Sequence, residues 1–246
     1  LTRALQIDGV NVDITAHVGL SICPEHGHDA EALLRQADFS VDLARGEARF
    51  LHVFDPARDK PDPDRLGLMG ELRKGVEAGE FQVYYQPKID VASGRIKGAE
   101  ALVRWIHPER GFMPPDSFIP FAEQTGQIRI LTDWVLATAM DSAAAWRRDG
   151  HDLTVAVNLS VRDLVNPALP EIVARELAVR SLPPEALTLE ITEGALMEDQ
   201  DLVLTILEKL AALGVPLSID DYGTGYSSLS YLKRLPVREL KIDKSF

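Results

Sequence analysis

Hydrophobic and polar positions alternate strictly near the start of the chain. From Val10 to Ile22 every second residue is apolar, and the residues between them are polar or glycine. A period of two predicts a β-strand on a sheet with one buried and one solvent-facing side. Helical spacing follows over residues 30–45, and an apolar run over 51–54 predicts a short strand. These elements are too few for an independent domain.

The composition changes abruptly after this region. Between Asp55 and Arg65 every residue is charged or proline except Ala57. Such a shift marks a boundary between two structural units. The predicted organisation is a first unit over residues 1–55, a linker over 56–65 and a second unit over 66–246.

The second unit shows a repeating strand–helix rhythm after a helix over about 64–78. Its first two strands are joined by a tight polar turn, and its later strands are apolar runs typical of parallel strands covered on both faces. The pattern predicts a parallel α/β fold, either a barrel or a doubly wound sheet. The predicted strands are residues 81–89, 96–105, 153–159, 187–192, 215–219 and 239–242, and the later helices are 115–150, 164–181, 199–213 and 226–234.

Polar residues recur where these strands end. The carboxyl ends of barrel strands open onto one face, where active sites are built. Acidic side chains that converge there repel one another unless a metal ion neutralises them. The strand-end residues are Glu100, Asn158, Glu190, Asp220, Asp221, Lys241 and Asp243.

The acids and the amide offer only oxygen ligands, which favours a hard cation, Mg²⁺ or Mn²⁺. Adjacent Asp220 and Asp221 could each face a different ion of a two-metal site, an arrangement suited to phosphoester hydrolysis. Arg104 could pair with a phosphate oxygen, and Lys241 could hold or polarise the attacking water. Each residue alone also has a structural interpretation, such as a turn, a cap or an ion pair. The agreement of five strand ends favours a functional site.

Composition limits the partners. The chain has 26 basic and 38 acidic residues and a net charge of -12, which opposes binding to DNA or RNA. No apolar run approaches the ~20 residues of a membrane span. The single cysteine, Cys23, cannot form an internal disulfide. We therefore expect a cytoplasmic chain without direct membrane contact, whose parent protein could still be anchored through upstream domains.

Six motifs of the second unit resemble those of EAL domains, the bacterial phosphodiesterases that linearise cyclic di-GMP. The stretch Glu100–Trp105 resembles the signature that gives the family its name. The resemblance covers the chain from about residue 64 to its end. The other motifs, in chain order, are Tyr85–Pro87, Asn158–Ser160, Leu189–Glu193, Asp220–Leu229 and Lys241–Asp243.

The resemblance implies a modified TIM (β/α)8 barrel whose first strand is antiparallel. It further implies hydrolysis of cyclic di-GMP to linear pGpG with two ions of Mg²⁺ or Mn²⁺, and a homodimer formed through the EAL domain. A closed barrel has eight strands, so we expect this chain to be a slice truncated after about the sixth. The family's seventh strand carries further glutamates of the site. We therefore expect hydrolysis by the parent protein and weak or no turnover by the isolated chain.

The resemblance also implies roles for individual residues. Asp221 would bind the second ion, Lys241 would position the attacking water, and Glu193 would anchor the loop after the fifth strand, which in this family couples dimerisation to catalysis. Substrate would be contacted by Gln86, Arg104 and Asp243. The first ion would be bound by Glu100, Asn158, Glu190 and Asp220.

The first unit resembles the C-terminal part of a GGDEF domain, the diguanylate cyclase module. The similar stretches are Ile14–Leu20, Leu33–Asp38 and Phe54–Pro56. The chain contains no Gly-Gly-Asp/Glu-Glu-Phe sequence, so we expect no cyclase activity from it.

Two other functions were weighed against the hydrolase. A non-catalytic EAL-like module would bind cyclic di-GMP or a protein partner, but degenerate members lose the strand-end acids that this chain keeps. A two-carboxylate glycosidase could use paired acids on a barrel. It would explain neither the Asp220–Asp221 pair beside Asn158 nor Lys241.

Overall fold

The chain forms two units, Leu1–Leu66 and Gly67–Phe246, in a computed structural model. The structure describes residues 5–7, 10–12, 16–46, 50–56, 63–197, 199–223, 232 and 234–243. The predicted linker over 56–65 lies mostly outside these residues, so its bounds stay a prediction.

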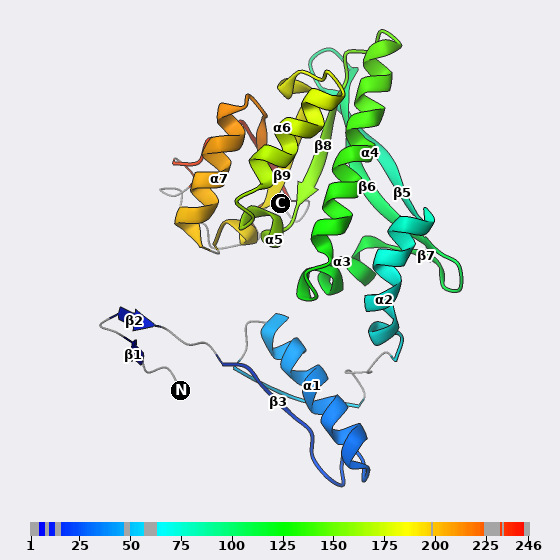
Figure 1. Cartoon of the computed structure of the whole chain (residues 1–246), viewed down its shortest axis with the longest axis vertical. Coiled ribbons are helices and arrows are strands. Elements are labelled where there is room, and N and C mark those ends of the chain that lie inside the picture. Colours follow the sequence, from blue (N-terminus) through cyan, green and yellow to red (C-terminus); the bar gives the residue numbers. More distant parts are fainter. Residues whose placement is uncertain are drawn as a thin grey trace. The chain divides into compact units, whose positions relative to one another are not determined.

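Short strands and one helix make up the first unit (Figure 1). The elements are β1 (Leu5–Ile7), β2 (Val10–Val12), β3 (Val18–Leu20), α1 (Ala30–Gly46) and β4 (Leu51–Val53). Strands β1 and β2 pair antiparallel, and β3 and β4 pair parallel. The predicted strand over 10–22 is therefore two strands, and its residues 13–15 lie outside the described part.

Helix α1 covers the face of β3 that carries Gly19. A Cβ atom at Gly19 would clash with the carbonyl oxygen of Ala37, so the helix backbone approaches as closely as only glycine permits. The apolar side chains of Val18 and Leu20 lie on the other face and are 37% and 39% exposed. The prediction of a buried apolar face is therefore wrong for this strand, because the close approach at Gly19 decides which face the helix covers.

Among the described residues, a seven-stranded sheet forms the centre of the second unit. Its strands are β5 (Phe81–Asp90), β6 (Arg95–His107), β7 (Gly111–Met113), β8 (Thr154–Leu159), β9 (Leu187–Thr192), β10 (Leu217–Tyr222) and β11 (Glu239–Ile242). They run in the order β11-β10-β9-β8-β6-β5, with β7 paired to β6. Strands β5 and β6 are antiparallel, and each neighbouring pair from β6 through β8, β9 and β10 to β11 is parallel. The predicted antiparallel first strand is thus confirmed.

Helices follow the strands as predicted, with two differences. The predicted helix over 115–150 is divided near Gly126, whose φ of +72° a helix cannot accommodate, and the one over 164–181 is divided before Pro170. Most of the predicted helix over 226–234 lies outside the described residues. The helices are α2 (Pro63–Ala78), α3 (Pro115–Gln124), α4 (Ile128–Arg148), α5 (Val161–Leu164), α6 (Leu169–Val179) and α7 (Gln200–Ala212), with 3₁₀ turns η1 (Pro184–Ala186) and η2 (Glu193–Met197).

The sheet is rolled so far that side chains of its two edge strands touch. Lys88 on β5 and Glu239 on β11 form an ion pair of 3.0 Å between Nζ and Oε2. In a flat sheet these strands would lie about 24 Å apart, because neighbouring strands are spaced about 4.8 Å. This contact excludes the doubly wound sheet that the strand–helix rhythm left open. The architecture is barrel-like, although no backbone ladder joins β5 to β11 among the described residues.

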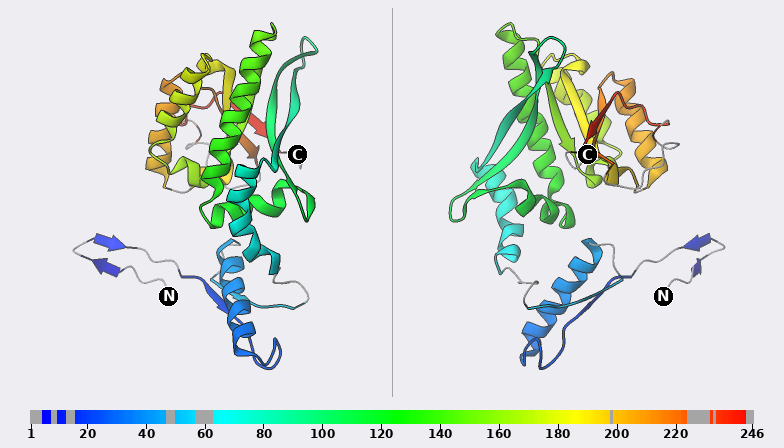
Figure 2. Two further views of the ribbon diagram at one scale, coloured as in Figure 1. Left: turned by 45° about the vertical axis from the view of Figure 1, so that its right-hand side comes forward. Right: turned by 180° about the vertical axis from the view of Figure 1, so that it is seen from behind.

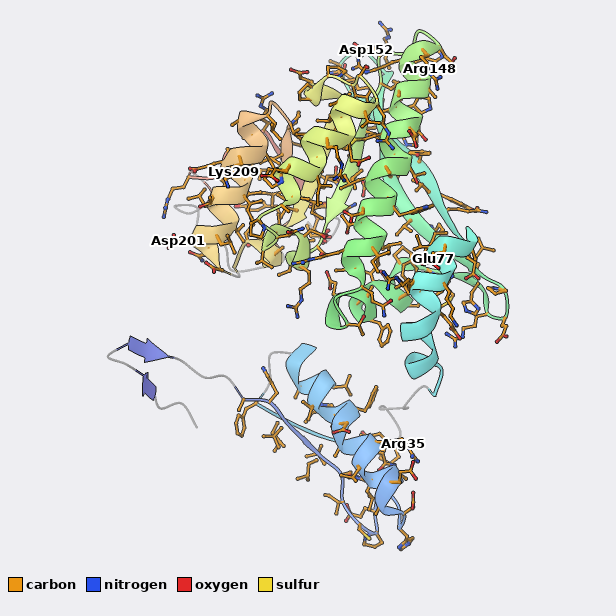
Figure 3. The ribbon with its side chains drawn as sticks, in the orientation of Figure 1. Arg35, Glu77, Arg148, Asp152, Asp201 and Lys209 are labelled. Carbon is orange, nitrogen blue, oxygen red and sulfur yellow. The ribbon has the colours of Figure 1, made fainter. Side chains whose placement is uncertain are left out.

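Helices α4, α6 and α7 lie side by side on the outer face of this sheet (Figure 1), and the view from behind shows the strands in front of them (Figure 2). Trp105 anchors the core between β5, β6 and α3. Its side chain is fully buried, stacks on Phe81 at 4.7 Å between ring centroids, and donates a hydrogen bond of 2.9 Å to Glu80. The charged residues Asp201 and Lys209 mark the solvent side of α7 (Figure 3).

A helix that crosses a bilayer must be both long and apolar. None of the described helices combines the length and the apolar character needed to cross a bilayer.

Strands β6 and β8 approach each other closely at Gly98, so a substitution there tests how they pack. A Cβ atom there would lie 2.5 Å from the carbonyl oxygen of Thr154 on β8. We expect Gly98→Ala to lower the free energy of unfolding by about 1–3 kcal/mol, the range of overpacked sites. Urea unfolding followed by tryptophan fluorescence measures this unit, because all three tryptophans lie in it.

Gly194→Ala is the matched control for this substitution. A Cβ atom at Gly194 meets nothing within 4 Å, and the residue is not in the left-handed region. We expect this variant to keep or slightly raise stability, by less than about 1 kcal/mol. Equal losses in both variants would contradict the proposed packing of β6 on β8.

Candidate active site

Three carboxylates from three strands meet inside the rolled sheet. Alternation places them there: Leu189 and Ile191 of β9 are buried on one side of the strand, and Glu190 between them lies on the other. The same alternation brings Glu100 from β6 and Asp220 from β10 to the cluster. Glu190 is fully buried, and the side chains of Glu100 and Asp220 are 17% and 19% exposed.

The ammonium group of Lys241, from β11, lies at the centre of this cluster. Its Nζ donates hydrogen bonds to Glu190 Oε2 and Asp220 Oδ2, both at 2.7 Å, and to Glu100 Oε2 at 3.1 Å. Burial alone would lower the pKa of Lys241, but the hydrogen bonds to Asp220 and Glu190 raise it above its ordinary value. Lys241 is therefore charged at any physiological pH.

Two further side chains hold two of the three remaining carboxylate oxygens. Asn158 Nδ2, at the end of β8, donates to Glu100 Oε1 at 2.9 Å, and Lys88 Nζ donates to Glu190 Oε1 at 3.0 Å. Burial raises the pKa of Glu190, an effect that Lys241 and Lys88 oppose. Sequence reasoning missed Lys88; the signal available was its place two residues after Gln86, on the same face of β5.

Strand β10 is irregular beside the cluster, where its pairing with β11 shifts register between Ile219 and Tyr222. Asp221 has a φ of +53°, and its backbone N–H donates to Asp220 Oδ1 at 2.9 Å. Glu193, buried at the end of β9, accepts a hydrogen bond of 3.0 Å from the backbone N–H of Gly223. This contact supports the anchoring role predicted for Glu193. Residues 224–229 of the predicted dimer loop lie outside the described residues.

The remaining predicted residues surround the cluster at different distances. Gln86 lies opposite Glu100 in the β5–β6 ladder, so their side chains are neighbours on one face. Asp243 is close enough to contribute to the raised pKa of Asp221, after burial and Asp220. Arg104 shares the face of Glu100, but its guanidinium lies 5.6 Å from the ring centre of Tyr84 and donates to the backbone carbonyl of Val103.

A cavity of about 250 Å³ opens beside Asn158, between β6, β8 and helices α3 and α4. Its lining is mostly apolar, with Leu102 and Ile119 among its residues, and Ser160 and Thr192 add hydroxyl groups. The cavity thus adjoins the acidic cluster at the carboxyl ends of the strands.

The donor set fits a hard divalent cation. One oxygen each from Glu100, Glu190 and Asp220 lies within 4.8 Å of the others. These three carboxylates and the Lys241 ammonium leave two negative charges, which one divalent cation would balance. Carboxylate oxygens, with the amide oxygen of Asn158 nearby, are the ligands that Mg²⁺ and Mn²⁺ prefer. The arrangement could therefore hold a metal ion at the strand ends.

Comparison with curated proteins finds similar chains in several bacteria. The bifunctional diguanylate cyclase/cyclic di-GMP phosphodiesterase MucR of Pseudomonas aeruginosa is 40% identical over 248 residues, which cover 100% of this chain and 36% of that protein. The cyclic di-GMP phosphodiesterase PdeR of Escherichia coli is 37% identical over 248 residues, covering 100% of this chain and 37% of that protein. The chain thus spans about a third of the length of these curated relatives.

Solved structures show the same fold. The PaMucR phosphodiesterase in complex with c-di-GMP matches with a TM-score of 0.70 and 46% identity, covering 73% of each chain. The FimX EAL domain of Pseudomonas aeruginosa bound to c-di-GMP matches with a TM-score of 0.66 and 26% identity over 72% of each chain. The family model of the EAL domain matches residues 69–246. The acidic cluster and its strands therefore lie in a chain that belongs to the EAL-domain family.

Proposed function

We propose that the protein containing this chain hydrolyses cyclic di-GMP to linear pGpG with the help of a divalent cation. The observation that carries the proposal is the convergence of Glu100, Glu190 and Asp220 on one ammonium group at the strand ends. Such a cluster suits phosphoester hydrolysis, in which charge on the phosphate must be neutralised. Relatives named as cyclic di-GMP phosphodiesterases support the choice of substrate.

The reaction adds one water molecule across one phosphodiester bond. The water oxygen bonds to phosphorus, the bond from phosphorus to one sugar oxygen breaks, and that oxygen takes up a proton. The product is a linear dinucleotide with a terminal phosphate.

Glu100, Asn158, Glu190 and Asp220 would hold the first ion, and Asp221 would contribute to a second. When bound, Mg²⁺ or Mn²⁺ supplies Lewis acidity and lowers the pKa of water. Lys241 now gives its N–H groups to three carboxylates. If one of these carboxylates held the ion, Lys241 would have an N–H group left with which to position the attacking water.

Substrate contacts complete the proposed site. Gln86 lies beside Glu100, and Asp243 lies near Asp221. Arg104 would have to leave the ring of Tyr84 to reach a phosphate oxygen. The cavity beside Asn158, whose lining is mostly apolar, would be the place for one guanine base.

A homodimer and a cytoplasmic location stay predictions. Residues 224–229 of the loop expected to couple dimerisation to catalysis lie outside the described part of the chain. The net charge of -12 supports the proposal that nucleic acids are not partners.

Glu100→Gln tests the role of the cluster. The substitution preserves the size of the side chain but removes one negative charge and half of its acceptor capacity. We expect the rate of pGpG release to fall at least ~100-fold, because even partners of metal ligands are worth 10–100-fold. Chromatography of the products with Mg²⁺, with Mn²⁺ and with excess chelator measures this, and the chelator should stop the wild type.

Glu109→Gln is the matched control, since Glu109 is exposed just beyond the end of β6. It should keep the wild-type rate. Binding of cyclic di-GMP with no linear product under either ion would contradict hydrolysis and favour a binding module. Undiminished turnover by Glu100→Gln would contradict the assigned cluster.

Glu193 offers a second test, of the anchored turn. Glu193→Ala removes the acceptor for the N–H of Gly223, so Asp221 loses its fixed position and the rate should fall ~10–100-fold. Glu193→Gln keeps an acceptor oxygen and should retain most of the rate. The rate of pGpG release is measured for both variants at saturating Mn²⁺. Equal losses of rate in the two variants would contradict an anchor that acts through this hydrogen bond.

A further inference from the structure

Lys88 lies on β5 of the rolled sheet, outside the six sequence motifs to which functional roles are assigned. Its Nζ lies 3.0 Å from Glu190 Oε1 and 3.0 Å from Glu239 Oε2, so one ammonium links β5 to both β9 and β11. The side chain is 30% exposed and lies on the inner face of β5. It is the second cation, beside Lys241, that contacts Glu190.

The two oxygens of Glu190 are held by different lysines. Lys241 binds Oε2, the oxygen on the side of the acidic cluster, and Lys88 binds Oε1. The side chain of Glu190 is fully buried, so an oxygen that loses its donor gains no water in exchange. Leaving a buried charged group without its partner is costly. Lys88 therefore fixes the direction in which Oε2 points.

Lys88 is itself held by Glu239. The side chain of Glu239 is 44% exposed, and its charge cancels that of Lys88. The pair thus holds Glu190 without adding net charge to the site, which a lone lysine beside a cation site would do.

We propose that Lys88 is a positioning residue that orients Glu190 toward a bound divalent cation, with Glu239 holding Lys88 in place. The effect of Lys88 on turnover rests on the proposed function, whereas the effect of Lys88 on the affinity for a metal ion does not. The alternative is a plain ion pair of the barrel wall, in which the contact between β5 and β11 stabilises the fold and Glu190 keeps its orientation without it.

Direct titration of the protein with Mn²⁺ separates the two. We expect Lys88→Met to weaken Mn²⁺ binding, followed by calorimetry or by the electron paramagnetic resonance of free Mn²⁺, by ~10–100-fold. The double variant Lys88→Met/Glu239→Gln removes both charges of the pair. It should lose as much Mn²⁺ affinity as Lys88→Met, because both variants lose the side chain that orients Glu190. Lys88→Arg restores a donor that reaches both acids and should regain most of the affinity.

Lys97→Met is the control on the same hairpin. Lys97 is 71% exposed and pairs with Asp90, away from the acidic cluster, so Mn²⁺ affinity should not change. In turnover assays, Lys88→Met should need more Mn²⁺ for half-maximal rate while its KM for cyclic di-GMP at saturating Mn²⁺ stays at the wild-type value. Should Lys88→Met fail to fold in a thermal melt, Lys88→Gln replaces it with the same expected loss.

Three results would overturn the inference: unchanged Mn²⁺ affinity in folded Lys88→Met, recovery of wild-type affinity in the double variant, or no rescue by Lys88→Arg. The proposed function fails separately. A full-length parent protein that binds Mn²⁺ and releases no pGpG overturns hydrolysis, and the Mn²⁺ titrations still decide the role of Lys88.

Discussion

One ammonium group makes this arrangement of acids possible. Glu100, Glu190 and Asp220 come from three strands, and their mutual repulsion would be severe where water is scarce. Lys241 contacts all three at 2.7–3.1 Å, so its positive charge offsets part of the repulsion among them. The three carboxylates and Lys241 together keep two excess negative charges, which a bound divalent cation would balance. Fold and chemistry therefore depend on the same set of contacts.

The two faces of the rolled sheet differ in polarity: the outer face is apolar and the inner face carries charged side chains. Apolar residues on the outer faces of β8, β9 and β10 are buried, Leu189 and Ile191 among them, whereas Leu240 and Ile242 of β11 are exposed. A barrel interior is ordinarily filled by branched apolar side chains. Here the inner positions carry charged groups that neutralise one another in chains, from Glu239 through Lys88 and Glu190 to Lys241. The rolled sheet is held from within by ion pairs and from outside by hydrophobic contact.

Sequence patterns predicted the strands and the strand-end acids because both follow from short-range periodicity. The antiparallel first hairpin could be predicted from the tight turn that joins its strands. Lys88 could not, since its partners lie 102 and 151 residues away and no local pattern reports such a contact. The direction of Arg104, which lies over Tyr84, depends on a neighbouring strand for the same reason. At Gly19 a missing side chain, which no hydrophobicity pattern records, decided the packing of α1.

The ion pairs of β11 also govern when the site can exist. Lys241 reaches Glu100 across 141 residues, and Glu239 reaches Lys88 across 151. Contacts between such distant residues form only after the intervening loop has closed, which makes folding of such topologies slow. During synthesis the acids of β6, β9 and β10 are made before their lysine. A partly made domain that still lacks β11 therefore carries the three acids without the lysine that contacts them.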